Sequence, residues 1–236
     1  MNEEELWLYT LCKKNNVFIT DIQTHCLYSF KTLVLDWNKK INLISRKNEE
    51  NIWKGHIALS LSMLFKIDFR PGMKILDLGT GGGFPGIPLS ILLPDCSFTL
   101  LDSTQKKITC VQSMVESLQL KNVKTVWGRA EDLNQKNQYH HSFDTVVMRS
   151  VSNLSNLLEW GIPFLKQSKG ENIGQDKLSI AAPSLVTFKG AEIEGEEKAA
   201  KNNFRSIALQ SIPLTFLGSE EFDRIDKKLI VATVRY

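Results

Sequence analysis

The chain has 236 residues, of which 42% are hydrophobic and 23% are charged, and its formal net charge is +3. This composition is typical of a globular protein of one or two domains and excludes a disordered chain or a collagen-like rod. The longest apolar stretches, such as 87–94, are far shorter than the ~20 residues that span a bilayer, so we expect no membrane-spanning helix. The acidic first residues do not resemble a signal peptide, and the four cysteines form no Cys-x-x-Cys pair. We therefore expect a cytoplasmic protein with reduced thiols and no metal site.

The first 70 residues are predicted to be helical. Thr20 offers an N-cap to a helix whose apolar positions continue to Trp37, and a second helix is expected from about Asn51 to Phe65, before Arg70-Pro71-Gly72 ends it. From Lys74 onward short apolar strands alternate with helices, which indicates a mostly parallel sheet covered on both faces. The strands are predicted at 74–78, 97–102, 123–127, 143–148 and 185–188, and the helices near 85, at 104–118, 153–165 and 192–204. Residues 166–179 are predicted to form a loop, and 207–217 with 229–234 an antiparallel edge pair.

A glycine-rich loop follows the first predicted strand, with the sequence Asp-Leu-Gly-Thr-Gly-Gly-Gly-Phe-Pro-Gly from Asp77 to Gly86. Glycine is needed where the backbone takes a positive φ or approaches a ligand closely. Gly81, Gly83 and Gly86 match the spacing of a dinucleotide fingerprint, but that fingerprint should begin directly at the strand end, where Gly79 stands. An acidic strand end followed by alternate glycines suits S-adenosylmethionine better, because that ligand brings an ammonium group and has no pyrophosphate. The remaining alternative is an ordinary tight turn.

Three further segments end strands at the same predicted edge of the sheet. Asp102 is placed to accept hydrogen bonds from ribose hydroxyls, or else to cap the helix that starts near Thr104. Ala130 is small enough to let an adenine approach. Arg149 is a candidate for binding the cofactor carboxylate or a phosphate, unless it is a solvated charge at a strand end.

These motifs, together with Trp37 to Leu43, Leu101 to Ser103 and Lys189-Gly190, resemble the bacterial 16S ribosomal RNA guanine-N7 methyltransferases, the glucose-inhibited division protein B family. The resemblance implies the α/β fold of class I S-adenosylmethionine-dependent methyltransferases, which has a Rossmann-like, mostly parallel seven-stranded sheet with an antiparallel edge. It also implies an N-terminal helical cap, here 1–70, before a methyltransferase domain at 71–236, and S-adenosylhomocysteine as the product. The expected cofactor-binding residues are Asp77, Gly79, Thr80, Gly81, Gly83, Phe84, Asp102, Ser103, Ala130, Glu131 and Arg149, and the catalytic candidates are Arg149 and Lys189.

The chain departs from the family pattern at four positions. His56 and Ser60 match a His-x-x-x-Ser pattern, but Gly55 and Leu59 stand where the family usually has Arg and Asp. Met148 and Ser150 likewise replace Ser and Ala around Arg149. These changes concern the contacts between the cap and the site more than the cofactor site itself.

Methyl transfer to guanine N7 needs no general base, because N7 carries a lone pair and no hydrogen. The motifs expected for other acceptors are absent: there is no Asn/Asp-Pro-Pro-aromatic motif, and Cys96 and Cys110 are more typical of packing residues. We expect 16S ribosomal RNA or the small ribosomal subunit as partner of a monomeric enzyme. The basic residues Lys39, Lys40, Arg46 and Lys47 are expected to bind RNA, or else to form a solvated helix face. A small-molecule methyltransferase and a non-catalytic adenosyl-ligand binder remain as alternatives.

Overall fold

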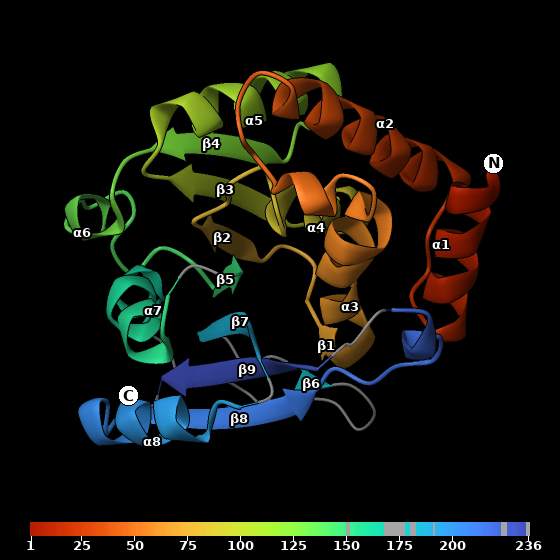
Figure 1. Ribbon diagram of the computed structural model, residues 1–236. Coiled ribbons are helices and arrows are strands. Elements are labelled where there is room, and N and C mark those ends of the chain that lie inside the picture. Colours follow the sequence, from red (N-terminus) through yellow and green to blue (C-terminus); the bar gives the residue numbers. More distant parts are fainter. Residues whose placement is uncertain (150–151, 168–177, 180–182, 191, 223–225, 235–236) are drawn as a thin grey trace.

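The computed structural model describes residues 1–149, 152–167, 178–179, 183–190, 192–222 and 226–234, with residues 47, 178, 179 and 221 described by their backbone alone. In these residues a seven-stranded sheet has the order β4-β3-β2-β5-β7-β9-β8 (Figure 1). Its strands are β2 (Lys74–Leu78), β3 (Ser97–Asp102), β4 (Val123–Trp127), β5 (Thr145–Arg149), β7 (Ser184–Gly190), β8 (Ile207–Pro213) and β9 (Lys227–Val234). β9 lies between β7 and β8 and runs antiparallel to both. The predicted mostly parallel sheet and its antiparallel edge are therefore confirmed.

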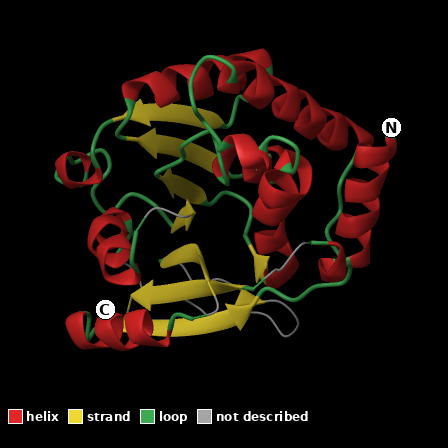
Figure 2. Cartoon of the chain, in the orientation of Figure 1, coloured by secondary structure: helices red, strands yellow, loops and turns green. Residues whose placement is uncertain are grey.

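Helices cover both faces of the sheet, as Figure 2 shows. Side chains that alternate along a strand point to opposite faces, so Ile75 and Val147 join one core while Leu76 and Val146 join the other. The first core is shared with α1 (Glu3–Lys14), α2 (Asp21–Asn38), α3 (Leu59–Lys66), α4 (Gly86–Leu92) and α5 (Gln105–Ser117). The second is shared with α6 (Ala130–Leu133), α7 (Leu154–Gly161) and α8 (Glu194–Asn203). None of the described helices is long and apolar enough to cross a bilayer.

Local sequence signals start the N-terminal helices. Asn2 and Thr20 each form a capping box, in which the cap side chain accepts from the backbone of Glu5 and of Gln23 respectively. Ahead of α3 the chain forms a π-helix, Trp53–Ala58, that continues directly into it. These helices pack against the same face of the sheet as α4 and α5. They therefore form one wall of the space beyond the carboxyl ends of the strands.

Several predicted boundaries were wrong. Part of the predicted loop at 166–179 is a strand, since β6 (Leu178–Ser179) pairs in parallel with β1 (Ile67–Asp68) as a separate two-stranded sheet. The predicted helix at 153–165 ends as α7 at Gly161 and continues as a 3-10 helix, Ile162–Phe164, in which the proline cannot donate a helical hydrogen bond. The predicted strand at 207–217 ends at Pro213, and a 3-10 helix at Ser219–Glu221 follows. A further 3-10 helix spans Arg46–Asn48.

Gly86 begins α4 in a space that admits no side chain. A Cβ there would lie 2.2 Å from Leu100 Cδ2 and 2.6 Å from Asp77 Oδ2. We expect Gly86→Ala to lower the free energy of unfolding by about 1–3 kcal/mol or more, as overpacking does. Gly195→Ala is the matched control, because nothing lies within 4 Å of its Cβ position in α8, and it should stabilise the helix by about 0.5–1 kcal/mol. Urea unfolding of both variants measures the difference; equal stability of the two would contradict the packing argument.

Candidate active site

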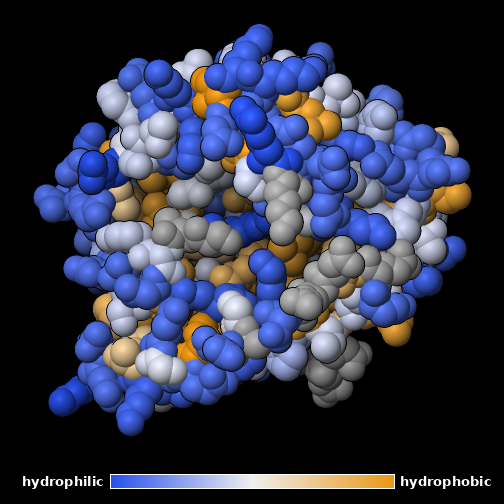
Figure 3. Space-filling view, viewed as in Figure 1, coloured by the Kyte–Doolittle hydropathy of each residue, from blue (hydrophilic) through white to orange (hydrophobic). Residues whose placement is uncertain are grey.

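A cavity of about 800 Å³ lies where the carboxyl ends of β2, β3, β4 and β5 meet. Open α/β sheets bind ligands at this edge, and the volume is that of a small-molecule site. The face seen in Figure 3 is hollowed at its centre and bordered mostly by hydrophilic residues. One wall is formed by strand ends and the loops after them, and the other by residues between Leu43 and Leu59 of the N-terminal helical region.

The glycine loop forms the floor of the cavity and has the backbone geometry that its sequence predicts. Gly79, Gly81 and Gly83 have φ values of +79°, +56° and +92°, which glycine adopts without strain. Gly79, Thr80 and Gly81 line the cavity. Gly83 is turned away from it, and a Cβ there would lie 2.7 Å from Ile87 Cδ1. Gly83 therefore lets the loop pack on α4 and is not among the residues that line the cavity.

Asp77 is fully buried and faces α4, outside the cavity lining. Its Oδ2 accepts hydrogen bonds from Thr80 Oγ1 at 2.6 Å and from Gly86 N at 2.8 Å. Oδ1 has no partner among the described residues. Burial raises the pKa of this carboxyl to about 7, although the two hydrogen bonds oppose the shift. Asp77 thus shapes the turn between β2 and α4, where the sequence had suggested a contact with a ligand's ammonium group.

Asp102 makes a hydrogen bond at the start of α5 and also lines the cavity, where the sequence predicts a ribose contact. Its Oδ1 accepts from Thr104 N at 2.8 Å, directly before α5, and its Oδ2 accepts from Gly81 N at 2.9 Å. The side chain is only 7% exposed and still lines the cavity. A carboxylate offers about four lone-pair positions, so two backbone bonds leave room for hydroxyl groups of a ligand. Asp102 therefore joins the glycine loop to the neighbouring strand end and faces the cavity.

Arg149 connects the sheet to the N-terminal helical region. From the end of β5 its Nη2 donates to Gly55 O at 2.7 Å and its Nη1 to His56 O at 3.3 Å, both in the π-helix. Its guanidinium carbon lies 5.8 Å from the centre of the Phe84 ring. Burial lowers the pKa of Arg149 to about 10, so it stays charged at neutral pH. It is not a solvated strand-end charge, and a guanidinium has five donors, so donors remain for an anion in the cavity.

His56 lines the cavity beside Arg149. Its ring centre lies 5.0 Å from that of Phe84, and its Nε2 is buried with no partner in the described part of the chain. Burial and the nearby charges of Arg149 and Lys227 lower the pKa of His56 to about 3, so the imidazole is neutral at pH 7. It can take part in hydrogen bonds there without adding charge.

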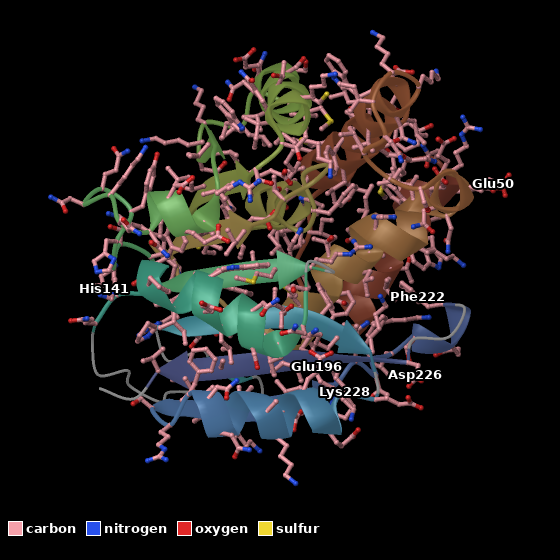
Figure 4. The ribbon with its side chains drawn as sticks, turned by 60° about the vertical axis from the view of Figure 1, so that its left-hand side comes forward. Glu50, His141, Glu196, Phe222, Asp226 and Lys228 are labelled. Carbon is pink, nitrogen blue, oxygen red and sulfur yellow. The ribbon has the colours of Figure 1, made fainter. Side chains whose placement is uncertain are left out.

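The other predicted cofactor residues gather at the same cavity, whereas the second catalytic candidate does not. Phe84, Ser103, Ala130 and Glu131 all line it. Lys189 instead donates to Ser152 O at 2.7 Å and pairs with Glu196 of α8, also at 2.7 Å. Glu196 lies between α7 and α8 in Figure 4. Lys189 therefore links β7 to Ser152 and to α8.

Lys39, Lys40 and Arg46, three of the four predicted RNA-binding residues, lie outside the cavity lining. Lys39 forms an exposed ion pair with Asp36, and Lys40 Nζ lies 5.2 Å from the centre of the Trp37 ring. Arg46 is exposed in the 3-10 helix at 46–48. The side chain of Lys47, like the whole of Ser150, lies outside the described residues.

Three of the four departures from the family pattern lie in the described residues, two at the cavity and one in the core. Gly55 and Leu59 line the cavity, and a Cβ at Gly55 would meet only the side chain of Asn51, at 3.5 Å. There is therefore room for a side chain at position 55. Met148 is fully buried in the second core, away from the cavity.

Several cavity residues were missed from the sequence, and Trp160, Phe222 and Lys227 are the most distant of them from the predicted motifs. Lys227 begins β9 opposite Gly190, the last residue of β7. Because β9 is antiparallel, its first residue lies at the edge where the parallel strands end, and the predicted antiparallel pairing was the signal that could have placed it. No group of three His, Cys, Asp or Glu residues in the described segments is arranged to hold a metal ion.

The fold defines the class of the protein. The O-methyltransferase from Bacillus cereus, solved in complex with S-adenosylhomocysteine (SAH), superposes with a TM-score of 0.54 at 18% identity, covering 98% of this chain and 100% of that one. M. jannaschii TYW2, solved in complex with AdoMet, gives 0.52 at 14% identity, covering 84% and 80%. At these identities the likeness concerns the fold alone. It is the fold of S-adenosylmethionine-dependent methyltransferases, as predicted.

Sequence comparison defines the family. The family model GidB, described as rRNA small subunit methyltransferase G, matches residues 23–173. The protein named ribosomal RNA small subunit methyltransferase G from Chlorobium phaeobacteroides is 39% identical over 209 residues, covering 86% of each chain. The protein of that name from Bacteroides thetaiotaomicron is 39% identical over 184 residues, covering 78% of this chain and 82% of its own. The chain belongs to the GidB family. This confirms the predicted family, and with it a methyltransferase that uses S-adenosylmethionine.

The raised pKa of Asp77 makes stability depend on pH. In the folded state this carboxyl holds its proton up to about pH 7, while in the unfolded chain it loses it near pH 4. Between those values the folded state binds more protons, so stability from this group falls as pH rises. We expect Asp77→Asn to gain stability relative to the parent, by roughly 1.4 kcal/mol per pH unit across this window. Urea unfolding of the parent and of Asp77→Asn at pH 5 and pH 8 measures this difference in stability, with Asp132→Asn on exposed α6 as the control. A difference in stability that does not change with pH would contradict the prediction.

Proposed function

We propose that this chain transfers a methyl group from S-adenosylmethionine to N7 of a guanine in 16S ribosomal RNA. The observation that carries the proposal is the convergence of the glycine loop, Asp102, Glu131 and Arg149 on one cavity in a chain of the GidB family. The relatives named above are ribosomal RNA small subunit methyltransferases, which supports the substrate. The choice of N7 rests on the resemblance described above and on the missing amine and thiolate motifs.

The cavity residues suit each part of the cofactor. Asp102 has unused acceptor positions for ribose hydroxyls, and the small Ala130 with Glu131 borders the space for an adenine and its amino group. The backbone at Gly79 to Gly81 carries no large side chain between itself and the amino-acid portion. The unused donors of Arg149 face the cavity and complement a carboxylate. Asp77 and Gly83 support this site by holding the loop.

The proposed reaction requires alignment rather than proton transfer. S-adenosylmethionine supplies an electrophilic methyl group on a sulfonium, and guanine N7 supplies the lone pair. The neutral ring of His56 and the face of Phe84 form a wall that excludes water and adds no competing charge. Arg149 positions this wall through the π-helix carbonyls, which makes it the stronger of the two catalytic candidates. Lys189 is assigned a positioning role, because it holds Ser152 shortly after β5. Oriented binding of this kind lowers a barrier by about 7–11 kcal/mol.

The chain is proposed to consist of an N-terminal cap, residues 1–70, and a methyltransferase domain, residues 71–236. The cap is proposed to contribute the RNA contacts through Lys39, Lys40, Arg46 and Lys47. Lys54 and Lys107 line the cavity itself and continue the positive charge toward it. We propose a monomeric enzyme, and a ribosomal substrate supports a cytoplasmic location. Replacing Lys39, Lys40, Arg46 and Lys47 by Ala should weaken RNA binding and flatten its salt dependence, by roughly 0.7 in the log–log slope per lost phosphate contact on single strands.

Methyl transfer can be tested directly with tritium-labelled cofactor. We expect label in 16S ribosomal RNA or small subunits and none in free nucleotides, and 7-methylguanosine in the digested RNA by mass spectrometry. A methyl group on an exocyclic amine or on carbon 5 would contradict the N7 assignment. Modification of a small acceptor alone would support the small-molecule alternative, and SAH binding without any transfer would support the non-catalytic one.

Asp102 provides a test of the cofactor site. Asp102→Ala removes the acceptors for both Gly81 N and the proposed ribose hydroxyls, and charge-assisted hydrogen bonds contribute about 1.5–3 kcal/mol each. We expect SAH affinity to fall by roughly 10- to 100-fold, with a smaller loss for Asp102→Asn, which keeps one acceptor. Calorimetric titration measures both, with Asp132→Ala on α6 as control. An affinity equal to the parent's would show that Asp102 serves only the start of α5.

A further inference from the structure

Trp127 is an exposed aromatic residue beside the cavity for which the proposed reaction has no use. It ends β4, the outermost strand on that side of the sheet, and stands opposite Asp102 in the register of β3 and β4. Its side chain is 56% exposed, which is unusual for an indole. It does not itself line the cavity, although the next two residues, Gly128 and Arg129, do. The indole therefore lies next to residues that line the cavity but is not itself part of the lining.

The ring is held in a fixed orientation. Its Nε1 donates to Ser103 O at 3.1 Å, and Ser103 also lines the cavity. The hydrogen bond joins the end of β4 to the residue that follows β3. An exposed indole with its polar group satisfied presents a flat apolar face and no remaining donor, which suits stacking better than hydrogen bonding.

Three cations lie on the segments next to Trp127. Lys107 of α5 and Arg129 line the cavity, and Lys106 is exposed on α5. Glu131 and Asp132 are the acidic residues of the adjoining helix α6, and Glu131 is proposed above for the adenine. Cationic side chains around an exposed aromatic are the arrangement by which proteins hold single-stranded nucleic acid, with phosphates on the cations and a base on the ring.

We propose that Trp127 stacks on the base of an unpaired nucleotide next to the methylated guanosine, while Lys107 and Arg129 hold the adjoining phosphates. The proposal rests on the proposed function and adds to it a second RNA contact, on the opposite side of the cavity from the N-terminal cap. Stacking accepts any base, so this contact fixes the position of the strand without selecting its sequence. The stacking contact binds the flanking RNA outside the space proposed for the cofactor.

The test compares Trp127→Ala and Trp127→Phe with Phe18→Ala, a matched control that removes an aromatic 86% exposed in the connection between α1 and α2. Filter binding measures affinity for transcribed 16S ribosomal RNA, and calorimetry measures affinity for SAH. We expect Trp127→Ala to bind the RNA roughly 10-fold more weakly, with a raised KM for RNA, an unchanged kcat and unchanged SAH affinity. Trp127→Phe should recover most of the affinity, because it keeps the ring and loses only the hydrogen bond to Ser103.

The outcomes separate the two proposals. If the parent binds and methylates the RNA and Trp127→Ala does both equally well, the stacking contact is wrong and the proposed function stands. Equal losses of RNA affinity and SAH affinity in Trp127→Ala would place the indole against the cofactor, and this result would also overturn the proposed stacking contact. A parent that neither binds nor methylates ribosomal RNA would overturn the proposed function and the stacking contact together.

Discussion

The buried carboxylate of Asp77 is the interaction on which the site depends. One oxygen holds both the hydroxyl of Thr80 and the backbone N–H of Gly86, so a single side chain fixes the loop at its start and at its end. The four residues Gly79 to Gly82 of this loop line the cavity. Burying a carboxylate is unfavourable, as its raised pKa reflects. The hydrogen bonds from Thr80 and Gly86 oppose that free-energy cost. They also fix the conformation of a turn whose glycines could otherwise adopt many conformations.

A second tie joins the two halves of the cavity wall. Arg149 extends from the sheet to two carbonyl oxygens of the π-helix, and His56 of that helix meets Phe84 of the glycine loop. π-helical turns occur often at functional sites, and here the turn presents its carbonyls to a buried guanidinium. The N-terminal helices are therefore held against the strand ends by charge-assisted hydrogen bonds as well as by apolar packing. An anionic group of a ligand that accepts hydrogen bonds from the remaining donors of Arg149 therefore binds to a residue that is already hydrogen-bonded to the opposite wall.

The fold could be predicted from the sequence because it depends on periodicity and on the glycine loop, which are local signals. Gly79, Asp102, Ala130 and Arg149 were placed at one edge because each follows a predicted strand, and the carboxyl ends of parallel strands meet there. The direction of a side chain at a strand end was not predictable in the same way. Asp77 and Leu78 are neighbours, yet only Leu78 lines the cavity, because alternate residues face opposite sides of the sheet. The contacts of Lys189 were not predictable for a similar reason, since its partner Glu196 comes from a helix whose docking the sequence does not specify.

The long-range contributions to the cavity have a common cause. Phe222 and Lys227 come from near the end of the chain, and Leu43 to Leu59 come from near its beginning. Both groups are far from the glycine loop in the sequence, so sequence proximity does not indicate that they line the cavity. Lys227 arrives there because β9 reverses direction between β7 and β8. Each of these groups brings a cation to the cavity, Lys54 from the N-terminal segment and Lys227 from β9, whereas the strand-end wall carries Asp102 and Glu131 together with Lys107, Arg129 and Arg149. Among the described lining residues the carboxylates thus lie only where ribose and adenine are proposed to bind, while cations border the cavity on every wall, and this distribution follows from which segments the topology brings together.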